Sequence, residues 1–165
     1  MGSAETRFAE LMKTYGPALG RVVASYARPS DQDDLAQDIA MALWNALPAF
    51  RGDCSERTFV FRVAHNRALT HIARRRARGE ELPEIVDHTP TPEARASDRQ
   101  QIDRLFAAIR QLSVAYRQVL TMALEDMDHA EIGACLGISV ANVAVRLNRA
   151  RAALREQIEQ MEKPT

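Results

Sequence analysis

Long apolar runs are missing from the sequence. No stretch approaches the roughly 20 consecutive apolar residues that a membrane-spanning helix requires, and the first residues lack the charged-then-apolar pattern of a secretion signal. We therefore expect a cytoplasmic protein with no membrane association. Cysteine is also scarce, with only Cys54 and Cys135 present. In a reducing compartment, two cysteines so far apart in sequence predict free thiols rather than a disulfide framework.

Glycine and β-branched runs are rare as well, with seven glycines in 165 residues, whereas alanine, leucine and arginine are abundant. This composition predicts an all-α fold. Apolar residues keep helical spacing from Phe8 to Tyr26, but Gly16-Pro17 interrupts them, so we expect a kink or two abutting helices there. Further helices are predicted over roughly 32–47 and 55–78, the second capped by Ser55, over 102–112, and from Ser113 onward.

The segment 79–98 differs from the rest in composition. It has three prolines, six acidic residues and little apolar periodicity, which is typical of a flexible linker. We therefore predict two small helical domains, 1–78 and 99–165, joined by the linker 79–98.

The formal net charge is zero, because 22 basic residues balance 22 acidic ones. The balance hides a pattern: residues 51–78 carry eight arginines against two acids, and residues 128–155 carry four arginines against two acids. Two basic segments separated by an acidic one favour a polyanion contacted twice over ordinary solvated helix faces.

The predicted helix 32–47 should bury Leu35, Ile39, Leu43 and Ala46. Its outer face has an unusual composition: Asp34, Gln37, Asp38, Met41 and Trp44. An acidic rim around exposed apolar side chains is typical of a protein-binding surface. For Trp44 alone, packing under the first helix is an equally good interpretation.

In the predicted helix 55–78, Arg67, His71, Arg74 and Arg78 share one face. A row of guanidinium groups on a rigid helix suits the phosphates of a nucleic acid. Aromatic residues nearby could stack on unpaired bases. Phe61 falls in line with core positions and is predicted to be buried, whereas Phe59 lies nearly opposite and both roles stay open for it.

The last segment predicts a helix-turn-helix. Asp128 is expected to cap a short helix in which Cys135 is buried. Gly137 is expected to make the turn, and Ser139 is expected to cap the next helix. In that helix, the apolar positions that share one side are Val140, Val143, Leu147, Ala150 and Leu154. Asn142, Val145 and Arg149 lie on the opposite side. There, Val145 could contact a thymine methyl group or be an idle surface residue.

Signatures of metal binding and catalysis are missing. The histidines and cysteines have no metal-ligand spacing, and the chain has no nucleophile elbow, phosphate loop or carboxylate constellation. We therefore expect no cofactor, no metal, no small-molecule substrate and no enzymatic activity.

Two segments together resemble a known family. "DLAQDIAMALWNALPAFRGDCSERTFVFRVAHNRALTHIARRR" is similar to the second conserved region of sigma-70 family RNA polymerase sigma factors, and "DMDHAEIGACLGISVANVAVRLNRARAAL" to the fourth. The two-region layout resembles the extracytoplasmic-function (ECF) group. The resemblance implies a transcription initiation factor that binds core RNA polymerase and promoter DNA, helps to melt the minus-ten element and is covered by an anti-sigma factor.

The resemblance also implies roles for individual residues. The outer face 34–44, with Asp34, Gln37, Asp38, Met41 and Trp44, would bind core polymerase. Minus-ten DNA would be bound by the loop residues Phe50, Arg51, Gly52, Asp53, Cys54, Ser55 and Glu56 and by the helix residues Phe59, Arg62, Asn66, Arg67, His71, Arg74 and Arg78. Minus-thirty-five DNA would be bound by Ser139, Ala141, Asn142, Val145, Arg146, Asn148 and Arg149.

Some positions depart from the family pattern. The family usually has tryptophan at the position of Phe59 and an aromatic residue at that of Glu56. Many members have a basic residue and a serine where this chain has Ala144 and Val145, which predicts fewer hydrogen bonds to bases. Two other functions fit the residues alone: a conventional dimeric helix-turn-helix regulator, and a protein-interaction adaptor or inhibitor.

Overall fold

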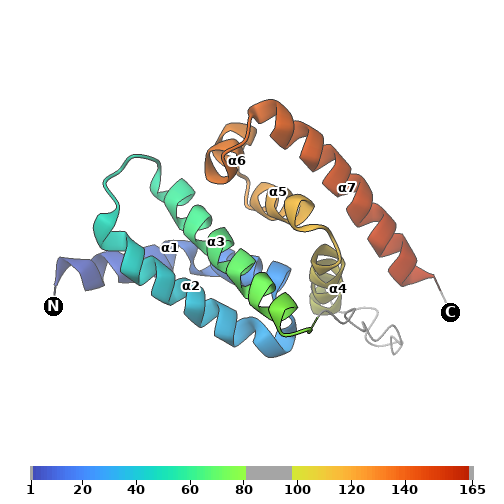
Figure 1. Cartoon of the computed structure of the whole chain (residues 1–165), viewed down its shortest axis with the longest axis horizontal. Helices are drawn as coiled ribbons and strands as arrows, with labels where there is room; N and C mark the ends of the chain where they lie inside the picture. Colours follow the sequence, from blue (N-terminus) through green and yellow to red (C-terminus); the bar gives the residue numbers. More distant parts are fainter. Residues whose placement is uncertain (1, 81–97, 164–165) are drawn as a thin grey trace.

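The computed structural model describes residues 2–80 and 98–163, and all regular structure in these ranges is helical. Figure 1 shows two groups of helices that lie side by side. The elements, in chain order, are α1 (Ser3–Tyr26), η1 (Pro29–Asp31), α2 (Gln32–Ala46), η2 (Leu47–Ala49), α3 (Glu56–Ala77), α4 (Asp98–Arg110), α5 (Val114–Leu124), α6 (His129–Leu136) and α7 (Val140–Glu162). The all-α prediction is confirmed. The predicted linker 79–98 falls mostly outside the described residues.

The first group packs α1, α2 and α3 around a shared apolar core. In α2, Leu35, Ile39 and Leu43 are buried as predicted, whereas Ala46 is only half-buried. The two-helix alternative for residues 3–26 is wrong, because α1 runs through Pro17 as one helix. A proline removes one backbone donor from a helix interior, yet α1 continues through it and packs against α2 and α3.

The second group contains α4 to α7, and the predicted helix-turn-helix is present within it. Asp128 and Glu131 form a capping box at the start of α6. Gly137 ends α6 at φ 67°, the left-handed region that favours glycine. Ser139 caps α7 by accepting a hydrogen bond from the Asn142 backbone N–H at 3.1 Å. These local signals fix how α7 leaves the turn.

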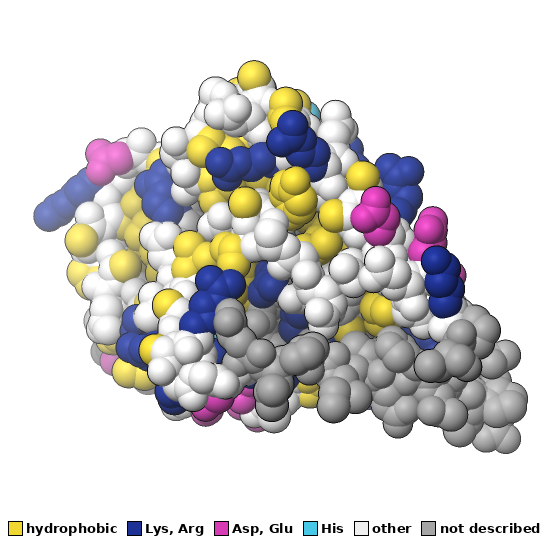
Figure 2. Space-filling view, turned by 45° about the vertical axis from the view of Figure 1, so that its right-hand side comes forward, with side chains coloured by type: hydrophobic (Ala, Val, Ile, Leu, Met, Phe, Trp, Pro, Cys, Tyr) yellow, Lys and Arg dark blue, Asp and Glu magenta, His cyan; other side chains and the backbone are white. Residues whose placement is uncertain are grey.

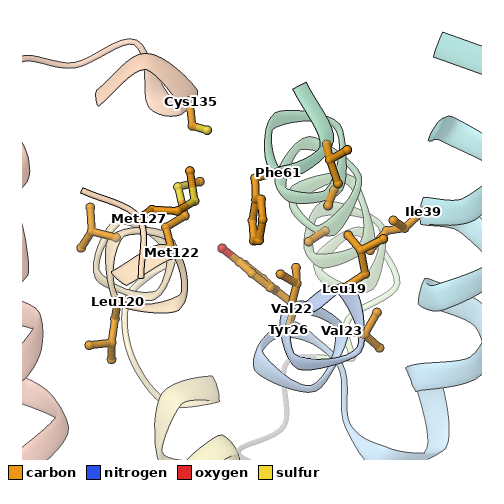
Figure 3. Packing of buried hydrophobic residues seen from close by; sticks show 14 of the residues in the cluster. Leu19, Val22, Val23, Tyr26, Ile39, Phe61, Leu120, Met122, Met127 and Cys135 are labelled. Carbon is orange, nitrogen blue, oxygen red and sulfur yellow. The ribbon is translucent and has the colours of Figure 1, made fainter. Parts of the chain in front are cut away.

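The core continues from one group into the other, which the sequence did not reveal. Helix α3 packs against α6, and α1 packs against α4 and α5. Phe61, predicted to be buried, is 1% exposed and points from α3 toward Met122 and Met127, beside Tyr26 (Figure 3). The two groups therefore form a closed arrangement in which they share apolar side chains.

No single helix within residues 2–80 and 98–163 has the length and apolar character to cross a membrane. The sharply bent pair α6 and α7 meets that criterion together, by length and composition only.

Candidate nucleic-acid and polymerase interfaces

The outer face of α2 is exposed and combines acidic with apolar side chains. Met41 is 56% exposed and Trp44 42%, and Asp34 and Gln37 are also exposed. The Trp44 ring makes an edge-to-face contact with Phe8 of α1, with centroids 5.3 Å apart. Trp44 therefore packs on α1 with one side of its ring and is exposed on the rest, and its role in protein binding stays a prediction. The face has the composition of a protein-binding surface.

The loop before α3 presents a stacked aromatic pair. Phe50 and Phe59 lie with ring centroids 4.5 Å apart and planes 21° from parallel, and the Arg7 guanidinium lies over the Phe50 ring at 5.5 Å. Both phenylalanines are half-buried. An aromatic platform beside a cation is an arrangement that single-stranded bases can stack on.

The same loop is joined to α3 by a helix cap. Ser55 caps the helix by accepting a hydrogen bond from the Thr58 N–H at 3.0 Å. Gly52 turns the loop at φ +81°, a conformation that other residues rarely adopt. Arg51, Asp53 and Glu56 are exposed, and Cys54 is half-buried. The loop therefore presents charges of both signs next to the aromatic pair.

The basic row on α3, made of Arg67, His71, Arg74 and Arg78, has acidic side chains close to it that the sequence did not indicate. Arg74 lies 3.8 Å from Asp38 of α2, and Arg78 lies 3.1 Å from Glu80. His71 is half-buried, and burial is the largest cause of its lowered pKa, while Asp31 and Asp38 oppose the shift. Asn66 is exposed and Arg67 half-buried. The row is thus partly neutralised by acids.

The arrangement of charge at the surface agrees with this. On the face drawn in Figure 2, Lys and Arg side chains form separate small groups among apolar and uncharged side chains. On this face, the basic side chains therefore form no single dense patch.

Helix α7 is buried along one side and exposed to solvent along the opposite side. Val143, Leu147 and Ala150 are buried, whereas Asn142, Val145 and Arg149 are exposed. Around them, Ser139, Ala141 and Asn148 are exposed and Arg146 is half-buried. One predicted core position is wrong: Val140 is 53% exposed. Periodicity gives the direction of a side chain but not where the neighbouring helices end, and Val140 is the first residue of α7, beyond the buried stripe.

Arg62, one of the candidate minus-ten residues, has a partner in the other group. Its Nη2 donates to the Ala134 carbonyl of α6 at 2.8 Å. Sequence reasoning also missed Arg21, Arg57 and Glu125, which join the two groups. Helical periodicity identifies faces, but it carries no signal for which exposed arginine meets which carbonyl or carboxylate of another domain.

Both cysteines are free thiols, as predicted. Cys135 is buried in α6, and its Sγ lies 3.6 Å from the Thr58 carbonyl of α3. Burial is the main cause that raises the pKa of the Cys135 thiol to about 11. The cysteine therefore packs as a small apolar side chain.

Two regions of the chain match known families. The family described as Sigma-70 region 2 matches residues 11–78, and the family described as Sigma-70, region 4 matches residues 102–154. These ranges contain α2 and α3 in the first case and the helix-turn-helix in the second.

Similarity to curated proteins extends over most of the chain. The RNA polymerase sigma factor NccH of Alcaligenes xylosoxydans is 32% identical over 156 residues, covering 89% of this chain and 84% of the relative. The RNA polymerase sigma factor CnrH of Cupriavidus metallidurans is 31% identical with the same coverages. The ECF RNA polymerase sigma-E factor of Escherichia coli is 24% identical, covering 90% of this chain and 85% of the relative.

Solved structures agree in fold. CnrH in complex with the cytosolic domain of CnrY superposes with a TM-score of 0.68 at 28% identity, covering 94% of this chain and 90% of that one. RpoE in complex with the anti-sigma factor NepR from Bartonella quintana gives 0.72 at 21% identity, covering 93% and 97%. The helical regions 2 and 4 and the similarity to curated sigma factors agree: the chain belongs to the sigma-70 family of RNA polymerase sigma factors, in the ECF group, and is a transcription initiation factor.

Proposed function

We propose that three surfaces divide the work of this initiation factor. The outer face of α2 binds core RNA polymerase. The 50–56 loop and α3 bind and help to melt the minus-ten element. The exposed face of α7 lies in the major groove of the minus-thirty-five element. The observation that carries the proposal is the side of α7 with Asn142, Val145 and Arg149, which is exposed opposite a fully buried stripe on a capped helix-turn-helix.

The minus-ten role is supported by the Phe50 and Phe59 pair. A base that leaves the duplex loses stacking, and an aromatic side chain replaces that interaction. The stacked pair lies beside Arg7, which attracts the phosphates of the melted strand. The same loop holds acidic Asp53 and Glu56, which disfavour close phosphate contact. Recognition here therefore depends more on stacking than on charge.

Division of binding among several surfaces fits the charge balance. With a formal net charge of zero, the protein has little general attraction to DNA, because nonspecific binding depends on neutralising phosphates. Each surface alone binds weakly, and joining them in one chain raises the effective concentration of the second contact once the first is made. The factor acts by binding alone, performs no covalent chemistry and works in the cytoplasm, where RNA polymerase is found.

An anti-sigma factor is the further partner that we propose. The RpoE structure similar to this chain holds the anti-sigma factor NepR, and the CnrH structure holds the cytosolic domain of CnrY. In this chain, exposed apolar side chains that suit such a partner are Met41, Trp44, Leu124 and Val140. A protein that co-purifies with the factor and, once isolated, inhibits its transcription activity would support this partner.

Run-off transcription with purified core polymerase on genomic fragments tests the main proposal. We expect transcripts that start at defined positions only when the factor is added. DNA binding as a dimer at palindromes, with no dependence on polymerase, would instead support a conventional regulator.

A further inference from the structure

A single carboxylate from the second group of helices holds an arginine of the first. Arg21 of α1 donates to both carboxylate oxygens of Glu125, from Nε at 2.5 Å and from Nη2 at 2.8 Å. Glu125 is the residue directly after α5, and its side chain is 9% exposed, against 50% for Arg21. The bond to Glu125 raises the pKa of Arg21. A bidentate pair of this kind fixes orientation as well as distance.

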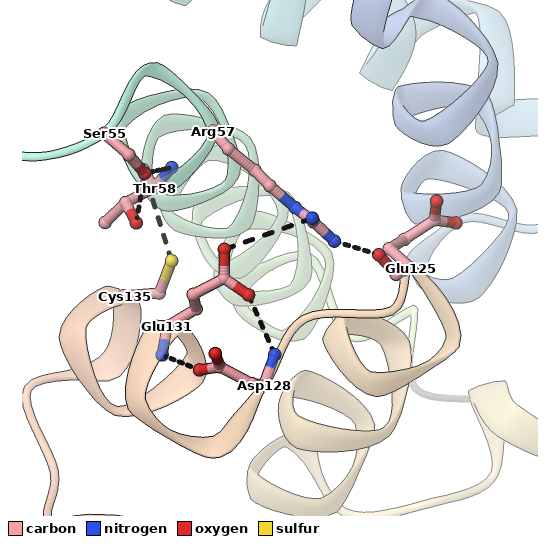
Figure 4. A network of polar contacts seen from close by, with 7 residues as sticks. All are labelled: Ser55, Arg57, Thr58, Glu125, Asp128, Glu131 and Cys135. Carbon is pink, nitrogen blue, oxygen red and sulfur yellow. Dashed lines mark hydrogen bonds and ion pairs between the residues drawn. The ribbon is translucent and has the colours of Figure 1, made fainter.

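A second arginine meets the same short segment. Arg57, in the first turn of α3, donates to the Glu125 carbonyl and lies 4.0 Å from the Glu131 carboxylate (Figure 4). Glu131 is also the capping-box residue of α6. The two arginines of the first group therefore bind residues 125 and 131, on either side of the start of the helix-turn-helix. We call Arg21, Arg57, Glu125 and Glu131 the interdomain cluster.

Other contacts between the groups use backbone carbonyls. Arg110 of α4 donates to the Ala24 carbonyl of α1 at 2.7 Å, and Arg62 of α3 donates to the Ala134 carbonyl of α6 at 2.8 Å. The Arg117 guanidinium lies over the Tyr26 ring at 5.4 Å. Two hydrogen bonds to carbonyls and one cation–ring contact therefore join the groups in addition to the interdomain cluster.

The closed arrangement is incompatible with binding both promoter elements at once. Elements centred at minus ten and minus thirty-five are about 25 base pairs apart, and at about 3.4 Å per base pair this is about 85 Å. A compact chain of this length has a radius of gyration of about 15 Å. Regions 2 and 4 must therefore separate before both can contact DNA, and Arg62 must leave Ala134 before it can bind the minus-ten element.

We propose that the interdomain cluster holds the free factor closed, so that regions 2 and 4 engage a promoter only after the cluster has been broken. This regulation rests on the proposed function of α3 and α7. Ion pairs with an exposed member contribute modestly and are weakened by salt, so binding to polymerase or DNA can break them. The nearly buried Glu125 carboxylate makes loss of its arginine more costly than loss of an exposed pair.

Charge reversal and its repair test the cluster. The variants are Arg21→Glu, Glu125→Arg and the double variant that exchanges the two residues. Lys13→Glu is the matched control, since Lys13 is exposed on the same helix and the substitution makes the same change in charge. Glu125→Gln removes the charge while keeping the shape, in case a reversal prevents folding. Small-angle X-ray scattering measures the radius of gyration, and circular dichroism checks that each variant remains helical.

We expect both single reversals to expand the chain at low salt, Glu125→Gln to expand it less, and the exchanged pair and Lys13→Glu to match the wild type. In run-off transcription, the single reversals should reach half-maximal activity at a several-fold lower factor concentration than the wild type. Scattering curves that are unchanged in both single reversals, or an exchanged pair as expanded as they are, would overturn the cluster. Expansion with an unchanged half-maximal concentration would overturn its regulatory role.

The two proposals can fail separately. A wild-type factor that directs no transcription, while its scattering responds to the reversals, would contradict the proposed function and leave the cluster in place. Normal transcription by the wild type, with scattering curves that do not change in the reversals, would support the proposed function and overturn the cluster.

Discussion

The Tyr26 hydroxyl lies 2.8 Å from Nδ1 of His65, so that a buried polar pair joins α1 to α3. Burial raises the pKa of Tyr26, which keeps its proton on the oxygen. The neutral His65 ring therefore makes this hydrogen bond without taking up a second proton. Burial lowers the pKa of His65 to about 3, so the folded protein resists placing a second proton on this ring.

The first prediction is that acid destabilises the fold through His65. The unfolded ring has a pKa of 6.5 and the folded ring about 3. Unfolding therefore takes up a proton between these values, and stability is complete above pH 6.5 and falls as the pH drops toward 3. At about 1.4 kcal/mol per pH unit, the free energy of unfolding should be about 2 kcal/mol lower at pH 5 than at pH 7.5 from this residue alone.

Urea titrations at the two pH values measure this difference. His71 contributes in the same direction, because its pKa is also lowered, chiefly by burial, so the comparison must be with His65→Gln. That variant should lose most of the pH dependence while keeping an amide beside Tyr26. An equal pH dependence in the variant and the wild type would show that His65 is not the titrating group.

The second prediction concerns polymerase binding by α2. Met41→Asp should weaken the affinity of the full chain for core polymerase at least tenfold, since Met41 is 56% exposed at the centre of the proposed surface. Asp38→Arg should do the same, and it also loses the 3.8 Å pair with Arg74. Fluorescence titration measures the affinity. Ala36→Asp, exposed elsewhere on α2, is the control, and equal affinities for all of these proteins would remove the assignment.

The third prediction concerns strand opening. Phe59→Ala removes one ring of the stacked pair with Phe50, so the mutant should form closed complexes but melt the minus-ten region at least tenfold less well. Permanganate footprinting detects the unpaired thymines. Phe59→Trp keeps a ring in place and should melt DNA normally. Full melting by the alanine variant would show that the aromatic pair has no part in opening.

The fourth prediction concerns the cysteines. Because burial raises the pKa of Cys135 to about 11, its thiolate fraction at neutral pH is about a hundredfold below that of a thiol with the ordinary value of 9.0. Maleimide should therefore modify the half-buried Cys54 first, as followed by intact mass. The double variant Cys54→Ser with Cys135→Ser should retain transcription activity. Stoichiometric zinc in the purified protein would contradict two plain thiols.

The helix caps, the turn and the buried faces of single helices were predictable because each depends on residues close together in the sequence. The caps at Ser55, Asp128 and Ser139 and the turn at Gly137 each depend on residues within four positions, and the buried stripes of α2 and α7 follow from spacing. The outer residues of both helices were exposed for the same reason. These parts of the fold follow from short-range physical chemistry that a sequence displays directly.

Contacts between elements were not predictable. The arginines of α3 looked like a free basic row, but Asp38 pairs with Arg74 because α2 packs beside α3. Arg21 and Glu125 are 104 residues apart, and no periodic pattern connects them. The helix predicted over 55–78 is confirmed, but the acidic partners of its arginines depend on this long-range packing and were not predicted. The assignment of the helix to minus-ten DNA stays a prediction.

The last prediction concerns Val145 in α7. The side chain is 48% exposed between Asn142 and Arg149 on the outward side. A valine there can only contact apolar groups, and the thymine methyl is the apolar group of the major groove. Val145→Ala should therefore lower affinity about fivefold or more for promoters with thymine at one minus-thirty-five position, and change other promoters little. Selection from randomised minus-thirty-five elements measures the preference.

Two controls make this prediction specific. Val140→Ala, at a valine that is 53% exposed at the start of the same helix but on another side, should leave the selected sequences unchanged. Arg149→Ala, if the guanidinium holds a phosphate, should weaken all sequences alike and reduce the salt dependence by about one ion. Because Val145 is exposed and outside the core, its truncation should not change the melting temperature. Identical selected sequences from the wild type and Val145→Ala would therefore mean that this valine reads no base and is an idle surface residue.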